Sequence, residues 1–199
     1  MRRQDKKTES KILEEKLKYI PNGSNSVLRK LLFNEQKGFC AYTETYLGRS
    51  DQKDIDHFNP LQEFISRNEY YNLFLCKAQW NKEKLNKWKK YQPILSPTSQ
   101  DFEERIIYNK DLKIFQAKNE HDIKANNLVK ILKLDDADLA DERKRYLERM
   151  VDYSVAYGIS IKEFFIKIIS ENNFEHIGFI RSVQEEFGIE IWDVIPEIT

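Results

Sequence analysis

The chain has 199 residues, of which 40% are hydrophobic and 13% aromatic, so it can bury the core of a globular domain and is not a disordered chain. Lys and Arg together number 33, as do Asp and Glu, and a net charge of zero does not favour non-specific nucleic-acid binding. Two cysteines are too few for a disulfide framework, and no run of 18 apolar residues indicates a membrane helix. We therefore expect a soluble, cytoplasmic protein without a membrane partner.

Five elements are predicted in the first half of the chain. Apolar residues at helical spacing predict helices over Leu13–Ile20 and Ser26–Gly38, with Ser26 as the cap of the second helix. Short strands are predicted over Phe39–Glu44 and Asp54–Phe58. A helix is predicted over Cys76–Lys90, after a long irregular loop. The order of two strands and a helix predicts a ββα unit.

The second half of the chain is predicted to be mostly helical. A β-hairpin is expected over Arg105–Tyr108 and Leu112–Phe115, joined by an Asn-Lys-Asp turn. After it, an apolar stripe at Leu128, Ile131 and Leu132 predicts one helix, and a longer helix capped by Asp138 is expected to end before Gly158. Two further helices are expected over Ile161–Ile169 and Phe174–Phe187, and Gly188 closes the last. Ile189–Ile195 alternates like a short strand or a docked tail. We expect an α+β fold with a helical segment over residues 1–30, the ββα core over 31–95, and a hairpin and helical region over 96–199. This last region is either part of the same globular unit or a small lobe.

The sequence Asp56-His57-Phe58-Asn59-Pro60 carries the strongest chemical signal. An imidazole with an ordinary pKa of roughly 6.5 is a ready base at neutral pH, and carboxylate and amide oxygens are hard ligands that suit Mg²⁺ or Mn²⁺. Neighbouring residues on a strand point to opposite faces, so Asp56 and His57 can flank one phosphate only at a twisted or bent hairpin end. Asp54 shares the strand face of Asp56 and is an alternative ligand.

With Asn72 and the run Asn81-Lys82-Glu83-Lys84, this pattern resembles the HNH endonuclease family, whose fold is a ββα-metal finger. The successive spacings from His57 to Asn72, Asn81 and Lys84 are 15, nine and three residues. The resemblance implies that Asp56 and Asn81 bind the metal and that His57 is the general base. It also implies that Asn72 braces the loop behind the imidazole and that Lys84 lies near the phosphates.

The chain departs from the many relatives that hold a structural zinc on two Cys-x-x-Cys pairs. Cys40-Ala41-Tyr42-Thr43 stands at the first position, and Cys76 is one position away from the register of the second. Four-ligand zinc therefore cannot form from these residues, and no structural zinc is expected. Packing by Tyr42, Phe74 and Trp80 is expected to replace it.

Two further features concern binding partners. Between residues 77 and 90 six lysines face a single glutamate, and we expect Lys77, Lys84 and Lys87 to contact the DNA backbone. The flank from Leu31 to Tyr42 resembles HNH proteins of bacterial anti-phage systems, of the Septu and retron-associated type, which work beside an ATPase partner.

The function expected from the resemblance is metal-dependent hydrolysis of DNA phosphodiester bonds in anti-phage defence, with RNA as an alternative substrate. Two other hypotheses remain open. The chain is either a catalytically silent HNH-fold module that binds DNA or a partner protein, or a subunit that cleaves only within an ATPase-containing complex.

Overall fold

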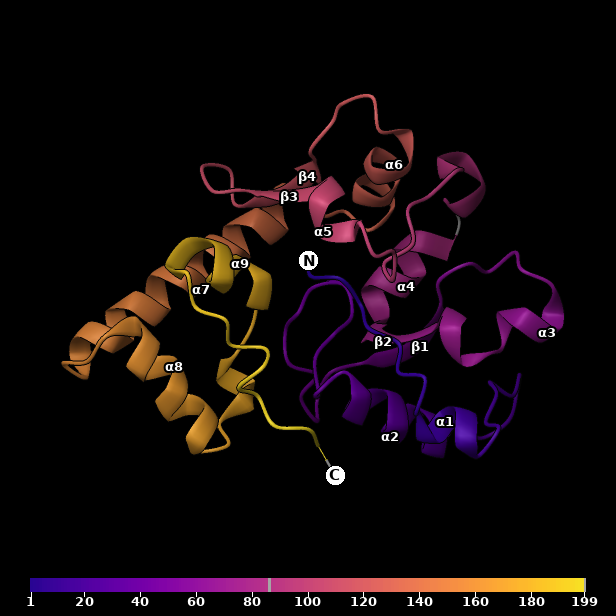
Figure 1. Cartoon of the computed structure of the whole chain (residues 1–199), viewed down its shortest axis with the longest axis horizontal. Helices are drawn as coiled ribbons and strands as arrows, with labels where there is room; N and C mark the ends of the chain where they lie inside the picture. Colours follow the sequence, from indigo (N-terminus) through magenta and orange to yellow (C-terminus); the bar gives the residue numbers. More distant parts are fainter. Residues whose placement is uncertain (86, 199) are drawn as a thin grey trace.

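A computed structural model describes residues 1–85 and 87–198 (Figure 1). The described residues form helices and two antiparallel hairpins, which is an α+β arrangement. The elements of the N-terminal part are α1 (Lys11–Glu14), α2 (Ser26–Glu35), β1 (Lys53–His57), α3 (Phe64–Arg67), the 3-10 helix η1 (Tyr70–Asn72), β2 (Leu73–Lys77), α4 (Ala78–Leu85) and η2 (Trp88–Tyr91). Those that follow are α5 (Phe102–Arg105), β3 (Ile106–Asn109), β4 (Ile114–Ala117), α6 (Ile123–Ile131), α7 (Ala137–Ala156), α8 (Ile161–Ser170), η3 (Phe174–His176) and α9 (Ile180–Phe187).

The described residues form two hydrophobic cores, and the chain passes from the first to the second between residues 134 and 139. The first core extends from the N-terminal segment through both hairpins to α6 and Leu134. The second core starts at Leu139 and is built by α7, α8, α9 and the C-terminal tail, with Phe39 added from the N-terminal part. In Figure 1 the helices α7, α8 and α9 lie together on the left, and β1, β2 and α4 lie on the right. The β3–β4 hairpin and α6 therefore share the first core with the hairpin of β1 and β2, while α7, α8 and α9 build the second.

The strands β1 and β2 pair antiparallel, and α4 follows β2 directly. Their register sets Asp56 opposite Phe74 and His57 opposite Leu73. The side-chain amide of Gln36 satisfies the outer edge of β2, because it accepts from the backbone N–H of Leu75 and donates to its carbonyl, both at 2.8 Å. The hairpin therefore has two strands, and the Gln36 amide takes the place of a third strand at Leu75.

The predicted strand over Phe39–Glu44 is wrong, and so is the predicted start of the helix at Cys76. Phe39 makes a single bridge to Tyr46, and between them the chain forms a tight turn in which Glu44 has a positive φ of 59°. The second strand of the ββα unit is Leu73–Lys77 instead. The apolar run from Leu73 to Cys76 fits a buried strand as well as a helix, so its periodicity alone does not separate the two.

The other predictions hold in part. The helices α2, α6, α7 and α8, the strand β1 and the β3–β4 hairpin lie where they are expected. The first helix ends early, at Glu14, since Lys16 adopts a left-handed conformation. The predicted helix over Phe174–Phe187 is interrupted because Phe179 has a φ of 50°. Asp136, not Asp138, caps α7, and the tail after Gly188 docks without forming a strand.

Among the described residues, no helix combines the length and the apolar character needed to cross a membrane.

Candidate functional site

The candidate site lies at the hairpin and the helix that covers it. Successive residues of a strand point to opposite faces, and β1 follows this rule to its end. Asp54 and Asp56 face α4, where they meet Asn81 and Lys84. His57 faces the other side, where its ring packs edge-on against Tyr19 with 4.6 Å between ring centroids. The structure therefore brings Asp56 and Asn81 to one face of the hairpin and His57 to the other.

Asp56 is buried, with only 1% of its surface exposed. Its Oδ2 accepts hydrogen bonds from the Tyr42 hydroxyl and from Nζ of Lys84, the latter at 2.6 Å. The carboxylate charge is thereby neutralised inside the protein. The predicted metal ligand is already bound to an internal cation.

Lys84 is fully buried, and all three of its ammonium protons have acceptors. Besides Asp56, the ammonium donates to the backbone carbonyls of His57 at 2.6 Å and Phe58 at 2.9 Å. Burial lowers the pKa of Lys84 below its ordinary value, and the neighbouring Asp56 carboxylate opposes that shift. The prediction that Lys84 contacts DNA phosphates is wrong for this structure, because the ammonium has neither exposure nor a spare proton.

His57 is half-buried and is held through its ring. Nε2 lies 3.0 Å from Oδ1 of Asn68, while the amide nitrogen of Asn68 donates to the carbonyl of Phe64 at 2.9 Å. Since Oδ1 of Asn68 can only accept, the neutral imidazole carries its proton on Nε2 and its lone pair on Nδ1. Burial lowers the pKa of His57 below 6.5, although the Asn68 hydrogen bond and Asp56 oppose the shift. The ring is therefore uncharged at neutral pH.

Asn72 holds the loop between β1 and β2. Its Oδ1 accepts from the backbone N–H of Asn59 at 2.8 Å, and its Nδ2 donates to the carbonyls of Asn59 at 3.0 Å and Arg67 at 2.9 Å. Both ends of the loop are thus tied to one side chain. Asn68, which binds the imidazole, was missed by the sequence analysis because it lies in an irregular loop without a periodic pattern.

The two cysteines and the three aromatic residues expected to replace a zinc lie in or against the first core. Cys40 and Cys76 are buried free thiols, and the backbone N–H of Lys77 donates to Sγ of Cys40 at 3.4 Å. Tyr42 and Phe74 lie beside each other, with 6.4 Å between ring centroids. Nε1 of Trp80 donates to the carbonyl of Leu132 at 3.2 Å, which ties α4 to the end of α6.

The residues assigned to a divalent metal do not fit one in this arrangement. Their oxygen donors are of the right chemistry. However, Oδ2 of Asp56 is bonded to Lys84 and Tyr42, and Asn81 directs its amide nitrogen to Oδ2 of Asp54 at 3.1 Å. Within residues 1–85 and 87–198, no three His, Cys, Asp or Glu side chains are grouped as a metal site. We therefore assign no chemical step to a metal ion.

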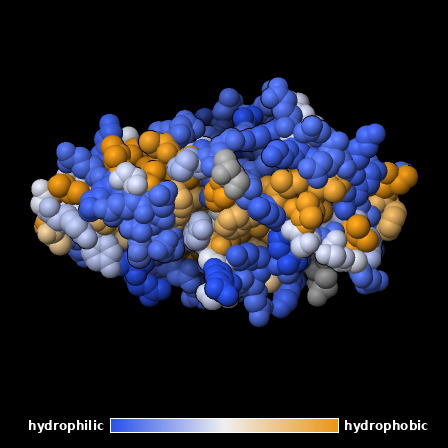
Figure 2. Space-filling model, turned by 90° about the horizontal axis from the view of Figure 1, so that it is seen from below, coloured by the Kyte–Doolittle hydropathy of each residue, from blue (hydrophilic) through white to orange (hydrophobic). Residues whose placement is uncertain are grey.

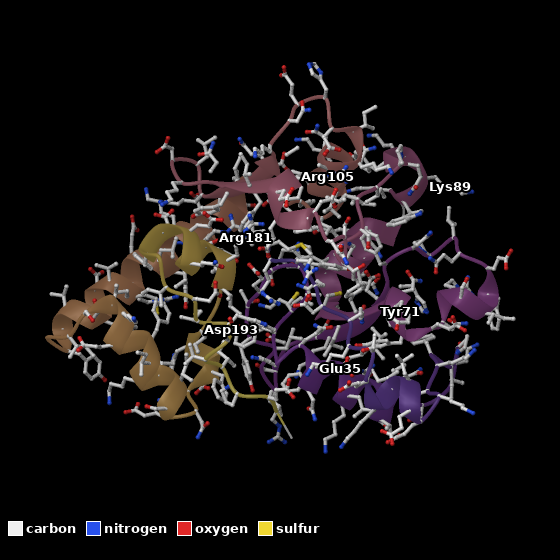
Figure 3. All side chains as sticks on the ribbon, in the orientation of Figure 1. Glu35, Tyr71, Lys89, Arg105, Arg181 and Asp193 are labelled. Carbon is white, nitrogen blue, oxygen red and sulfur yellow. The ribbon has the colours of Figure 1, made fainter. Side chains whose placement is uncertain are left out.

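The remaining lysines give α4 and η2 a basic surface. Lys82, Lys89 and Lys90 are exposed, Lys87 is partly exposed, and Figure 3 shows Lys89 pointing away from the molecule. Lys77 lies at the other end of the hairpin from His57, about 13 Å away at roughly 3.3 Å per residue. It lines an open cleft of about 400 Å³ whose wall includes Arg145 and Arg149 of α7.

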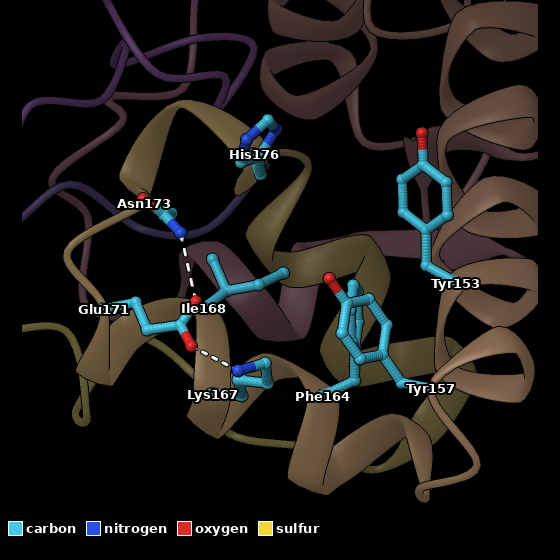
Figure 4. A pocket seen from close by; sticks show the side chains of 8 residues that line it. All are labelled: Tyr153, Tyr157, Phe164, Lys167, Ile168, Glu171, Asn173 and His176. Carbon is cyan, nitrogen blue, oxygen red and sulfur yellow. Dashed lines mark hydrogen bonds and ion pairs between the residues drawn. The ribbon is translucent and has the colours of Figure 1, made fainter.

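A separate pocket of about 260 Å³ lies on the helical part (Figure 4). It is lined by Tyr153 of α7, Tyr157 directly after that helix, and Phe164 and Lys167 of α8. Its described lining includes none of the predicted site residues. The pocket therefore adds nothing to the chemistry at His57.

Replacing Lys84 by methionine should lower the free energy of unfolding by about 3–5 kcal/mol, because it leaves the carboxylate of Asp56 buried without its cation. Urea denaturation measures the loss. Lys82→Met, on the exposed side of the same helix, is the matched control and should change stability by less than about 0.5 kcal/mol. Equal losses in the two variants would contradict the buried ion pair.

Protonation of His57 should lower the free energy of unfolding in acid. Its folded pKa lies below the unfolded value of about 6.5, so the unfolded chain takes up a proton first as the pH falls. Neutral His57 makes its full contribution to the free energy of unfolding above about pH 6.5, and this contribution is lost as the pH falls through the pKa of His57 in the folded protein. Urea denaturation from about pH 7.5 to 5 should show a smaller pH-dependent loss in His57→Gln than in the wild type. The exposed His121, replaced in the same way, serves as the control, and a loss unchanged in His57→Gln would contradict the argument.

Comparison with known proteins yields no relative: no family model, no curated protein and no solved structure matches this chain.

Proposed function

We propose that this chain is a nuclease of the HNH type that hydrolyses DNA phosphodiester bonds, with His57 as the general base. The observation that carries the proposal is the state of His57, whose ring is neutral, bonded to Asn68 through Nε2–H, and left with its lone pair on Nδ1. A base of this kind takes a proton from water near neutral pH. Asn72 supports the proposal, since it braces the loop that follows the histidine.

The proposed reaction forms one bond to phosphorus and breaks another. The oxygen of a water molecule attacks the phosphorus while Nδ1 of His57 takes the proton. The bond to the 3′ oxygen breaks, that oxygen gains a proton from solvent, and the phosphate stays on the 5′ end. In the family that the sequence resembles, Mg²⁺ or Mn²⁺ stabilises the charge on the phosphate. The described residues do not present a ligand set for that ion, so the proposal rests on His57.

The scissile phosphate would lie at His57, and the basic surface of α4 and η2, on the other face of the hairpin, would contact the DNA backbone away from that phosphate. Lys77 and Lys87 stay in the proposal as contacts to the DNA backbone, and the exposed Lys82, Lys89 and Lys90 extend the same charge. A role in anti-phage defence and an ATPase partner are proposed from the resemblance of the flank at Leu31–Tyr42 alone.

A second candidate function is a catalytically silent module that binds DNA or a partner protein. The ion pair between Asp56 and Lys84 favours it, because that pair removes the predicted metal ligand from use. The loop after β1 also exposes Leu61 (56%), Phe64 (62%) and Ile65 (67%), and Figure 2 shows apolar side chains at the end of the molecule where Figure 1 places α3. Exposed apolar patches of this kind commonly mark binding surfaces.

Plasmid cleavage distinguishes the two candidates. His57→Ala should lower the cleavage rate by a factor on the order of 10² or more, because general-base catalysis is worth that much, while DNA affinity stays nearly the same. The assay compares the wild type and the variant in Mg²⁺, in Mn²⁺ and in EDTA.

The control for this assay is His121→Ala, which alters an exposed histidine and should cleave like the wild type. Cleavage that is equal in all three proteins would show that His57 is not the base. Absence of cleavage by the wild type, both alone and with a candidate ATPase partner, together with retained DNA binding, would favour the silent module.

A further inference from the structure

We propose that the ammonium group of Lys84 occupies the position beside Asp56 that the family resemblance assigns to a divalent cation, and that it joins α4 to the end of β1. The cation of this site is then part of the chain. The inference rests on the proposed function in one respect: Asp56 is singled out as a metal ligand by the resemblance.

The contacts of Lys84 are those of a complete cation site. An ammonium group has three protons, and here three oxygens receive them at 2.6, 2.6 and 2.9 Å. The oxygens come from three successive residues, the carboxylate of Asp56 and the carbonyls of His57 and Phe58. One side chain therefore holds the strand end from which the imidazole of His57 projects.

The surroundings keep solvent and other ions out. The side chains of Lys84 and Asp56 are 0% and 1% exposed. The rings of Phe58 and Trp88 lie 5.5 and 5.4 Å from Nζ, where an aromatic face attracts a cation. A divalent ion on Oδ2 of Asp56 would have to displace the Tyr42 hydroxyl and would lie beside a buried ammonium. Like charges repel strongly in an environment of low dielectric constant.

The spacing of the helix explains how the site is built. Asn81 and Lys84 are three residues apart and share one face of α4, and Asp54 and Asp56 are two apart and share one face of β1. The structure pairs them in order, Asn81 with Asp54 and Lys84 with Asp56. The Asn-x-x-Lys pattern therefore has a structural use in this chain, which is to match two carboxylates of the strand.

Nuclear magnetic resonance on the isotope-labelled full chain tests the inference without relying on activity. Lysine ammonium protons are observed when they are buried and bonded, and they exchange too fast when they are exposed. We expect a signal of this kind from Lys84 at neutral pH, identified by its contacts to His57 and Phe58, lost in Lys84→Met and retained in Lys82→Met. Titration with diamagnetic Mg²⁺ should leave the chemical shift of the Asp56 carboxyl group unchanged, while an ion that binds at Asp54 or at exposed carboxylates shifts the signals of those groups instead.

A selective shift of the Asp56 carboxyl signal on addition of Mg²⁺ to the wild type, with disappearance of the ammonium signal, would overturn the inference. An ammonium of Lys84 that exchanges as fast as that of Lys82 would do the same. Because the ion titration and the ammonium exchange are both measured on the wild-type protein, they test the inference even if Lys84→Met does not fold. Failure of the proposed function appears separately, as equal plasmid cleavage by the wild type and His57→Ala.

Discussion

The ion pair between Asp56 and Lys84 is the contact on which the rest of the candidate site depends. Removing two charges from water is costly, and this is tolerated only when the remaining hydrogen-bonding capacity is satisfied. Here the Tyr42 hydroxyl adds a second donor to Asp56, and two backbone carbonyls complete the ammonium. The pair also joins the end of β1 to the last turn of α4, beside the hydrogen bond from Asn81 to Asp54. The position of the histidine follows from this junction.

The two faces of β1 have different chemistry. On the face toward α4, charge is neutralised internally and solvent is excluded. On the other face, His57 is uncharged, partly accessible and oriented by Asn68. The imidazole of His57 and the ammonium of Lys84 thus lie on opposite faces of the end of β1. This arrangement separates two parts of the proposed chemistry, since the state of His57 supports catalysis while the state of Asp56 favours a silent module.

The sequence patterns predicted the parts of the fold whose signals are local. The helices α7 and α8 and the β3–β4 hairpin carry caps, turns and apolar stripes within a few residues. The errors occur where contacts between residues far apart in the sequence decide the secondary structure. The run Leu73–Lys77 is a strand because β1 and the amide of Gln36 pair with it. The chain after Phe39 turns back, since Cys40 donates its N–H to the carbonyl of Thr45 at 2.9 Å.

By itself the sequence determined which chemical groups the hairpin and its helix carry: an Asp-His pair on a strand, an asparagine near the end of the loop, and a helix that presents Asn81 and Lys84. It also determined that Asp56 and His57 point apart, because alternation is a property of any extended strand. Only the tertiary structure decided the partners of these groups. Asn68 reaches His57 from the end of α3, and Lys84 reaches Asp56 across the hairpin–helix junction. Such pairings depend on distances between elements far apart in the chain, and spacing along the sequence does not specify them.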